Sequence, residues 1–244
     1  MKKIILPLIA SAAAAASSYA AIPANITEDC SGEILRSTNY TVMADDVTIT
    51  HSHTGARHYV GTFNLNGHSA TLVLSTSTSA PTKDYFAFDR SLPDGEATFK
   101  GNSAANVLDI KIAEGKDPAY VIGGFIVDSA TVNMGLGLAN EGRTKNVDVI
   151  NGGVLNWTGV AANGSYSNMK LAFNVGNSAS DNSKLVFKTA SQAWFAGVKM
   201  TVNGGTFDLN ANTGRFTFSQ MNVMSLSADA KSAIWVLMQT VHLQ

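Results

Sequence analysis

The segments VINGGVLNW (residues 149–157) and TVNGGTFDL (residues 201–209) are two copies of one motif, and this repeat decides the fold. They align without gaps at an offset of 52 residues, and both carry Asn-Gly-Gly between short apolar runs. Three pairs of apolar positions correspond: Ile150 with Val202, Leu155 with Phe207, and Trp157 with Leu209. Alternation with a period of two is typical of a strand with one buried face, so the last two pairs are expected to point inward. Asn156 and Asp208, which stand between them, are expected to point outward.

Two further segments resemble the motif in a degenerate form. Val175-Gly176-Asn177 lies halfway between the copies, and a polar insertion, residues 178–183, separates it from Leu185-Val186-Phe187. FNLNG at residues 63–67 runs on to TLVL at residues 71–74 with two extra turn residues. Repeat periods of about 20 to 50 residues indicate stacked coils, in which Asn side chains at equivalent turns can hydrogen-bond from coil to coil.

The repeat therefore predicts an all-β protein, a parallel β-solenoid (β-helix) with an irregular N-terminal β cap. The expected domains are a signal peptide at residues 1–20, the N-terminal β region at 21–118 and the solenoid repeats at 119–244. Glycine beside asparagine supplies the positive φ that a sharp corner needs. The two asparagines are expected at equivalent corners, and the corner residues are Asn151, Gly152, Gly153, Asn203, Gly204 and Gly205.

An antiparallel β-sandwich is the alternative fold. A strand, Asn-Gly and a second strand form the strongest short-range signal for a β-hairpin, and hairpins build sandwiches. The fixed offset between the copies favours the solenoid.

Residues 1–20 have the pattern of a secretory signal peptide. Lys2 and Lys3 provide the positive start, residues 4–16 are mostly apolar, and Ser18-Tyr19-Ala20 places small residues at positions −3 and −1 of a cleavage site between Ala20 and Ala21. The apolar run is too short to span a membrane, and no stop-transfer run follows it. We therefore expect export to the outer cell surface or the extracellular space, with the periplasm possible, and no transmembrane span in the mature chain.

Composition argues against several functions. Charged residues make up 14% of the chain, against an average near 25%, and the net charge is −1. Such a chain has no long-range field to attract nucleic acid, so we expect no nucleic-acid partner. Cys30 is the only cysteine, which excludes an internal disulfide and leaves an intermolecular one or no role at all.

Histidines cluster near the N-terminus of the mature chain. On a strand His51 and His53 would point the same way, and His58 could join them after the Thr54-Gly55 turn, which makes these three the candidate metal ligands. Their spacing matches no established ligand pattern, and the segment reads as an exposed loop, with Asp45-Asp46 nearby as a solvated turn. We therefore expect no metal site and no cofactor.

Carboxylates on the predicted strands are dispersed, one to each coil. A glycosidase needs two carboxyl groups about 5 to 10 Å apart, and a lyase needs clustered acids with a basic partner. The copies do not stack their acids on one face, so solvated outward positions are expected for Asp109, Asp128, Asp148 and Asp208. No catalytic residue is predicted, although a polysaccharide lyase or glycosidase on a β-helix remains the alternative function.

The signal-peptide pattern, the Asn-Gly-Gly corners and the charge-poor strands rich in Asn, Thr, Ser and Gly resemble the passenger regions of bacterial autotransporter-type surface proteins. The resemblance covers roughly residues 120–226. It implies a right-handed parallel β-helix with a non-catalytic adhesive or structural role, and a glycan or a host or matrix surface as its partner. The sequence departs from that family because no translocator barrel follows, and residues 241–244 lack a terminal aromatic.

One apolar run remains unexplained by the repeat. Residues 233–238, AIWVLM, carry no charge, whereas a solenoid needs a polar capping repeat at its end. We expect either that the chain is truncated at its C-terminus or that this run contacts a partner or the membrane.

Overall fold

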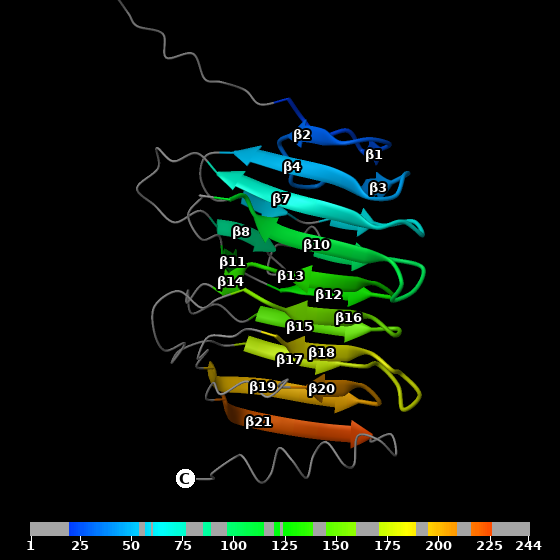
Figure 1. Ribbon diagram of the computed structural model, residues 1–244. Helices are drawn as coiled ribbons and strands as arrows, with labels where there is room; N and C mark the ends of the chain where they lie inside the picture. Colours follow the sequence, from blue (N-terminus) through cyan, green and yellow to red (C-terminus); the bar gives the residue numbers. More distant parts are fainter. Residues whose placement is uncertain are drawn as a thin grey trace, which may run out of the picture.

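The computed structural model describes residues 20–53, 57–59, 61–76, 85–88, 97–114, 120–122, 124–138, 145–159, 171–188, 195–208 and 216–225. These residues contain 21 β-strands and no helix. The strands stack in one column from β2 at the N-terminal end to β21 at the C-terminal end (Figure 1). None of the described residues belongs to a helix long and apolar enough to cross a membrane. Residues 1–19 of the predicted signal peptide (residues 1–20) and the apolar run 233–238 lie outside the described residues.

Three parallel sheets run along the column. The nine-stranded sheet contains β1 (Asn25–Ile26), β3 (Tyr40–Val42), β6 (Gly61–Asn64), β9 (Ala97–Lys100), β12 (Phe125–Asp128), β15 (Lys145–Ile150), β17 (Leu171–Val175), β19 (Phe195–Asn203) and β21 (Phe216–Ser225). The eight-stranded sheet contains β2 (Cys30–Gly32), β4 (Val47–His53), β7 (Ala70–Thr76), β10 (Val107–Ile112), β13 (Thr131–Met134), β16 (Val154–Trp157), β18 (Lys184–Phe187) and β20 (Thr206–Asp208). A shorter sheet contains β5 (Arg57–Tyr59), β8 (Tyr85–Phe88), β11 (Tyr120–Ile122) and β14 (Gly137–Leu138).

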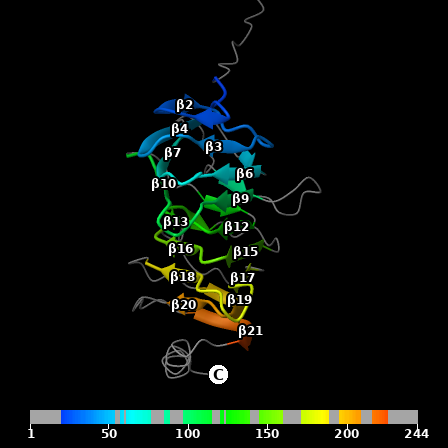
Figure 2. The same cartoon turned by 90° about the vertical axis from the view of Figure 1, so that its right-hand side faces the viewer.

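The chain visits these sheets in turn, as β6, β7, β8 and β9 do, and so completes one coil before it returns to the first sheet. Figure 2 shows the two longer sheets side by side along the column. Every strand pair among the described residues is parallel; β12 with β15 and β13 with β16 are examples. The predicted parallel β-solenoid is therefore confirmed, and the antiparallel sandwich is excluded.

The core lies between the sheets and is built from the inward members of the alternating strands. Leu155, Trp157 and Phe207 are 0%, 1% and 8% exposed, which confirms the predicted inward positions, whereas Leu209 lies outside the described residues. The indole Nε1 of Trp157 donates a 3.0 Å hydrogen bond to the carbonyl of Leu136. This bond satisfies the polar group of the buried ring, as is usual for a Trp in a protein core.

A continuous stack of aromatic rings follows the axis of the solenoid. Successive centroids lie 5.8 to 6.5 Å apart, which is the range of favourable ring contacts. The rings come from consecutive coils and belong to Tyr40, Phe63, Phe99, Phe125, Trp157, Phe187 and Phe207. Each of these coils therefore contributes at least one large ring, which contacts a ring of the coil before it.

The register corrects one part of the sequence alignment. Val149 lies opposite Val175, and Val175 lies opposite Val202, so the predicted match of Ile150 with Val202 is wrong by one residue in the nine-stranded sheet. In the eight-stranded sheet Leu155 and Phe207 both pair with Leu185, as the alignment requires. The second copy thus crosses the corner with one residue fewer.

This difference changes which residue turns the chain at the second corner. Asn151 has a φ of 55°, whereas Asn203 is still in β19 and Gly204 has a φ of 81°. The two asparagines therefore lie at the same corner, two coils apart, but at positions that differ by one residue in register. Glycine adopts the left-handed φ at no steric cost, so the shorter corner is tolerated at Gly204.

The stack continues without a break across the expected domain boundary at residues 118 and 119. Strand β9 pairs with β12, and β10 pairs with β13, so the described residues on both sides belong to one solenoid. The coil from Phe63 to its partner Phe99 takes 36 residues, but the coil from Val127 to Val149 takes only 22. Such unequal coil lengths hide the repeat from an alignment without gaps, which explains why the N-terminal region looked irregular.

Candidate functional site

Of the three candidate metal ligands, only His51 has a described side chain. His51 is 5% exposed and points into the core opposite Leu74, where its Nδ1 accepts a 3.0 Å hydrogen bond from the backbone N–H of Ile34. This position differs from the exposed loop expected from the sequence. The side chains of His53, on β4, and His58, on β5, lie outside the described residues. Where side chains are described, no group of three or more His, Cys, Asp or Glu could hold a metal ion.

The strand carboxylates are bonded to the next coil instead of to one another. Asp148 accepts a 2.7 Å hydrogen bond from Asn174 Nδ2, and Asp109 accepts one from Asn133 Nδ2. Asp128 accepts hydrogen bonds from Asn151 Nδ2 at 2.8 Å and from the Ser129 hydroxyl at 2.9 Å. These positions are outward as predicted, and each of the three carboxylates accepts a hydrogen bond from an asparagine of the next coil.

Asparagines extend two of these contacts into ladders along the stack. On the outer face of the eight-stranded sheet, Asn156 Nδ2 donates to Asn133 Oδ1 at 2.8 Å, and Asn133 donates to Asp109. The predicted corner ladder is present too, because Asn177 Nδ2 donates to Asn151 Oδ1 at 2.7 Å.

Each ladder runs towards the N-terminal end and stops at an aspartate. An asparagine amide can continue a ladder because it accepts a hydrogen bond from one coil and donates one to another, whereas an ionised carboxylate only accepts. The dispersed acids are therefore suited to end the ladders.

The carboxylate of Asp181 holds the polar insertion 178–183 against the preceding corner. Its Oδ2 accepts hydrogen bonds from the backbone N–H groups of Asn151 and Asn177, and its Oδ1 accepts from that of Gly152, all at 2.9 Å. Ser183 donates to Oδ1 from its backbone N–H at 2.9 Å and from its hydroxyl at 2.6 Å. Burial alone would raise the pKa of Asp181, but the hydrogen bonds from Ser183, Gly152 and Asn177 outweigh it and hold the pKa below its usual value.

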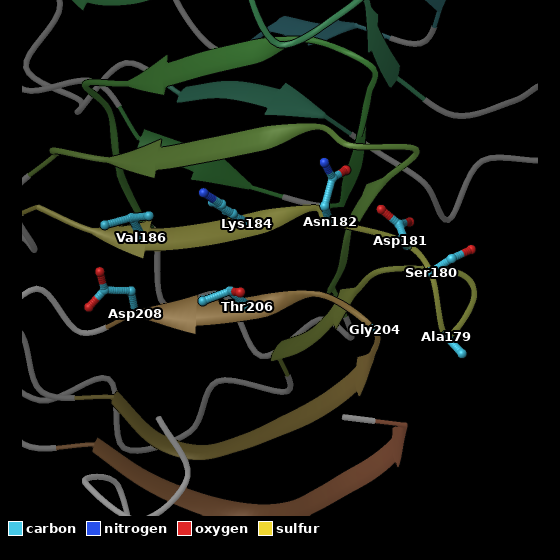
Figure 3. Close-up of a pocket in the computed structure, with 9 residues that line it drawn as sticks. All are labelled: Ala179, Ser180, Asp181, Asn182, Lys184, Val186, Gly204, Thr206 and Asp208. Carbon is cyan, nitrogen blue, oxygen red and sulfur yellow. The ribbon is translucent and has the colours of Figure 1, made fainter. Parts of the chain in front are cut away.

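A polar groove opens beside this insertion, on the outer face of β18 and β20. It has a volume of about 480 Å³. Figure 3 shows that the insertion forms one end, while side chains of the two strands form the floor. The lining residues are Ala179, Ser180, Asp181, Asn182, Lys184, Val186, Gly204, Thr206 and Asp208.

The floor of the groove combines both charges with neutral polar groups. Lys184 lies opposite Thr206, and Val186 lies opposite Asp208. Lys184 and Asp208 are exposed, and Lys184 forms no ion pair with any described residue. The groove thus offers one ammonium group, one carboxylate, hydroxyl and amide groups, and the apolar surface of Val186 to a ligand.

The two carboxylates in the groove are not equivalent. Asp181 is saturated with donors, and a general acid of a glycosidase needs a raised pKa rather than a lowered one. Asp181 is therefore suited to hold the insertion in place rather than to act as a general acid. Asp208 is exposed and lines the floor of the groove.

Sequence analysis identified the insertion and the outward position of Asp208, but not Asp181 or Lys184. A single Asp in a Ser- and Asn-rich loop gives no signal of its own. Comparisons of the chain with models of protein families, with curated proteins and with solved structures found no match. The function proposed below rests on the residues of the chain itself.

Proposed function

We propose that this protein is exported and acts outside the cell, without catalysis, in an adhesive or structural role. Its groove on β18 and β20, together with the polar outer faces, contacts a glycan of a host or matrix surface. The observation that carries this proposal is the groove itself, in which a rigid insertion stands beside an open floor containing Lys184, Thr206 and Asp208.

Export is supported by the first twenty residues. A positive start, an apolar run and small residues before Ala21 are the features that secretion machinery recognises. The bacterial outer surface is the destination that the resemblance to autotransporter passengers implies.

Preorganisation supports binding. The five hydrogen bonds to Asp181 fix the insertion before any ligand arrives, so binding does not have to order a loop. A glycan carries many hydroxyl groups, each able to donate and accept, and it can satisfy the amide, hydroxyl, ammonium and carboxylate groups of the floor together.

The outer faces also support an extended contact. Along the nine-stranded sheet one outward column carries mostly hydroxyl and amide side chains in consecutive coils, with few charges to repel a neutral polymer. Its members are Thr62, Thr98, Ile126, Asp148, Asn174 and Thr201.

A glycan array probed with the mature protein tests the proposal. We expect binding to a defined set of glycans with no release of reducing or unsaturated ends. Lys184→Ala should weaken that binding about tenfold, the usual cost of one charged hydrogen bond. Lys188→Ala is the matched control, because Lys188 is also exposed, follows the same strand and is not among the residues that line the groove.

Two results would overturn the proposal. Equal binding by both lysine variants and the unchanged protein would remove the groove from the contact. Cleavage of the bound glycan, abolished by Asp208→Asn, would assign the protein to the glycan-active enzymes.

A further inference from the structure

Two Asn-Gly corners of the solenoid have nearly the same backbone but different surroundings. Asn66 and Asn151 have φ values of 51° and 55°, and the glycines that follow, Gly67 and Gly152, have φ values of 89° and 75°. Both asparagine side chains are exposed. Because their backbones match, any difference in the chemical reactivity of the two asparagine side chains would come from the hydrogen bonds around each corner.

The corner at Asn151 is fully bonded. Asn151 Nδ2 donates to Asp128 at 2.8 Å, and its Oδ1 accepts from Asn177 at 2.7 Å. The backbone N–H of Gly152 donates to Asp181 Oδ1 at 2.9 Å and to the Ser183 hydroxyl at 3.0 Å. Both the side chain and the following nitrogen are therefore engaged with neighbouring coils.

The corner at Asn66 lacks these contacts. Its Nδ2 has only the Met43 sulfur, at 3.8 Å, and thioether sulfur is a weak acceptor. The backbone N–H of Asn66 donates to Asn64 Oδ1 at 2.9 Å, but this bond does not involve the Asn66 side chain and so does not restrain it. The N–H of Gly67 has no acceptor among the described residues, and Gly67 is exposed.

We propose that Asn66 is a site of spontaneous deamidation through a succinimide, and that the stack of coils protects Asn151 from the same reaction. The backbone nitrogen of Gly67 attacks Cγ of Asn66, and the new N–C bond closes the succinimide ring. The Cγ–Nδ2 bond breaks, and the amide group leaves as ammonia with the proton from the Gly67 nitrogen. Water then opens the ring at either carbonyl and leaves aspartate or isoaspartate at position 66.

Glycine makes this attack possible, because no side chain shields its nitrogen. To reach the attacking geometry, the asparagine side chain has to turn over the next backbone nitrogen. Asn151 must break two side-chain hydrogen bonds to do so, and the backbone N–H of Gly152 must break its hydrogen bond to the Asp181 carboxylate. Asn66 has only the sulfur contact to lose.

Peptide mapping of the mature protein by mass spectrometry tests this inference. The folded protein is kept in mildly alkaline buffer, and peptides that contain Asn66 and Asn151 are followed over time for the mass increase of deamidation. We expect Asn66 to react about tenfold faster or more, because two hydrogen bonds of ordinary strength protect Asn151. Electron-based fragmentation identifies the isoaspartate that only the succinimide route produces.

The denatured chain is the first control. Both asparagines precede glycine, so in denaturant the two rates should be similar. Asn177→Ala is the second control, because it removes the donor to Asn151 Oδ1 and should speed the reaction at Asn151 while that at Asn66 is unchanged. Equal rates in the folded protein, or a faster reaction at Asn151, would overturn the proposal.

Discussion

Asp181 joins two coils through one buried carboxylate, and its protonation should therefore weaken the fold. Because its pKa in the folded state is lowered, the carboxylate stabilises the protein fully above the unfolded value, near 3.8, and this contribution is lost as the pH falls through the folded pKa. Asp181→Asn should reduce stability at neutral pH by about 2 to 4 kcal/mol, since backbone donors lose a charged acceptor. The variant should also lose less stability than the unchanged protein as the pH is lowered below that value.

Denaturant unfolding at neutral and acid pH measures both effects. Asp45→Asn is a suitable control, because Asp45 is also a corner aspartate but is exposed. If Asp181→Asn were as stable as the unchanged protein at neutral pH, the cage around this carboxylate would contribute nothing to the fold.

The thiol of Cys30 should react slowly with alkylating reagents. Burial, followed by the nearby charges of Asp29 and Glu28, raises the pKa of its thiol, so little thiolate is present at neutral pH. We expect alkylation by iodoacetamide to be several-fold slower in the folded protein than in the denatured chain, and a non-reducing gel to show a monomer. A disulfide-linked dimer would instead assign Cys30 an intermolecular role.

Single-residue roles were the hardest to predict from the sequence. The outward position of Asp109 and the corner position of Asn151 follow from local alternation and from the Asn-Gly pair. The partners of Asp181 lie up to 30 residues away and depend on how two coils meet, which local patterns do not encode. The exposed position expected for His51 was wrong for a related reason, since its ring is buried and accepts a hydrogen bond from Ile34, 17 residues away.

Strand β16 contributes the largest ring of the aromatic stack. Trp157 contacts rings from three other strands, on β12, β17 and β18. Trp157→Ala should lower the free energy of unfolding by about 3 to 5 kcal/mol, because it leaves a cavity in a core that cannot collapse along the axis. Val154→Ala, on the outward side of the same strand, should cost only about 1 kcal/mol.

Thermal or urea unfolding of the two β16 variants measures the difference. A near-neutral Trp157→Ala would contradict the register in which Trp157 lies opposite Met134 and Phe187. A one-residue slip reverses the faces of a strand, so this comparison is sensitive to register.

Strand identity and strand direction followed from the sequence, but the register of the nine-stranded sheet did not. After the corner, the offset of 52 residues between the two copies is correct, since Leu155 and Phe207 both pair with Leu185 on β18. It fails before the corner because the second copy omits one corner residue. Sequence patterns report faces of a strand well, whereas the length of a corner depends on whether glycine can absorb the turn.

Coils of the solenoid contact mainly their neighbours, so the whole molecule should tolerate the loss of one complete coil. Val149 and Val175 occupy the same register position in consecutive coils, and deletion of residues 150–175 joins equivalent points of the stack. We expect the shortened protein to keep a β-sheet circular dichroism spectrum and cooperative unfolding at reduced stability. Each remaining coil then still finds a parallel neighbour in both long sheets.

Deletion of residues 150–169 is the matched control for this prediction. It removes β16 from the eight-stranded sheet but keeps β17 in the nine-stranded sheet. The two sheets then no longer have one strand each in every coil. We expect this variant to aggregate or unfold, because β13 and β18 would be separated by the width of a missing strand. If both deletions behaved alike, stability would depend on contacts beyond neighbouring coils, and the additive stack would be the wrong description of the molecule.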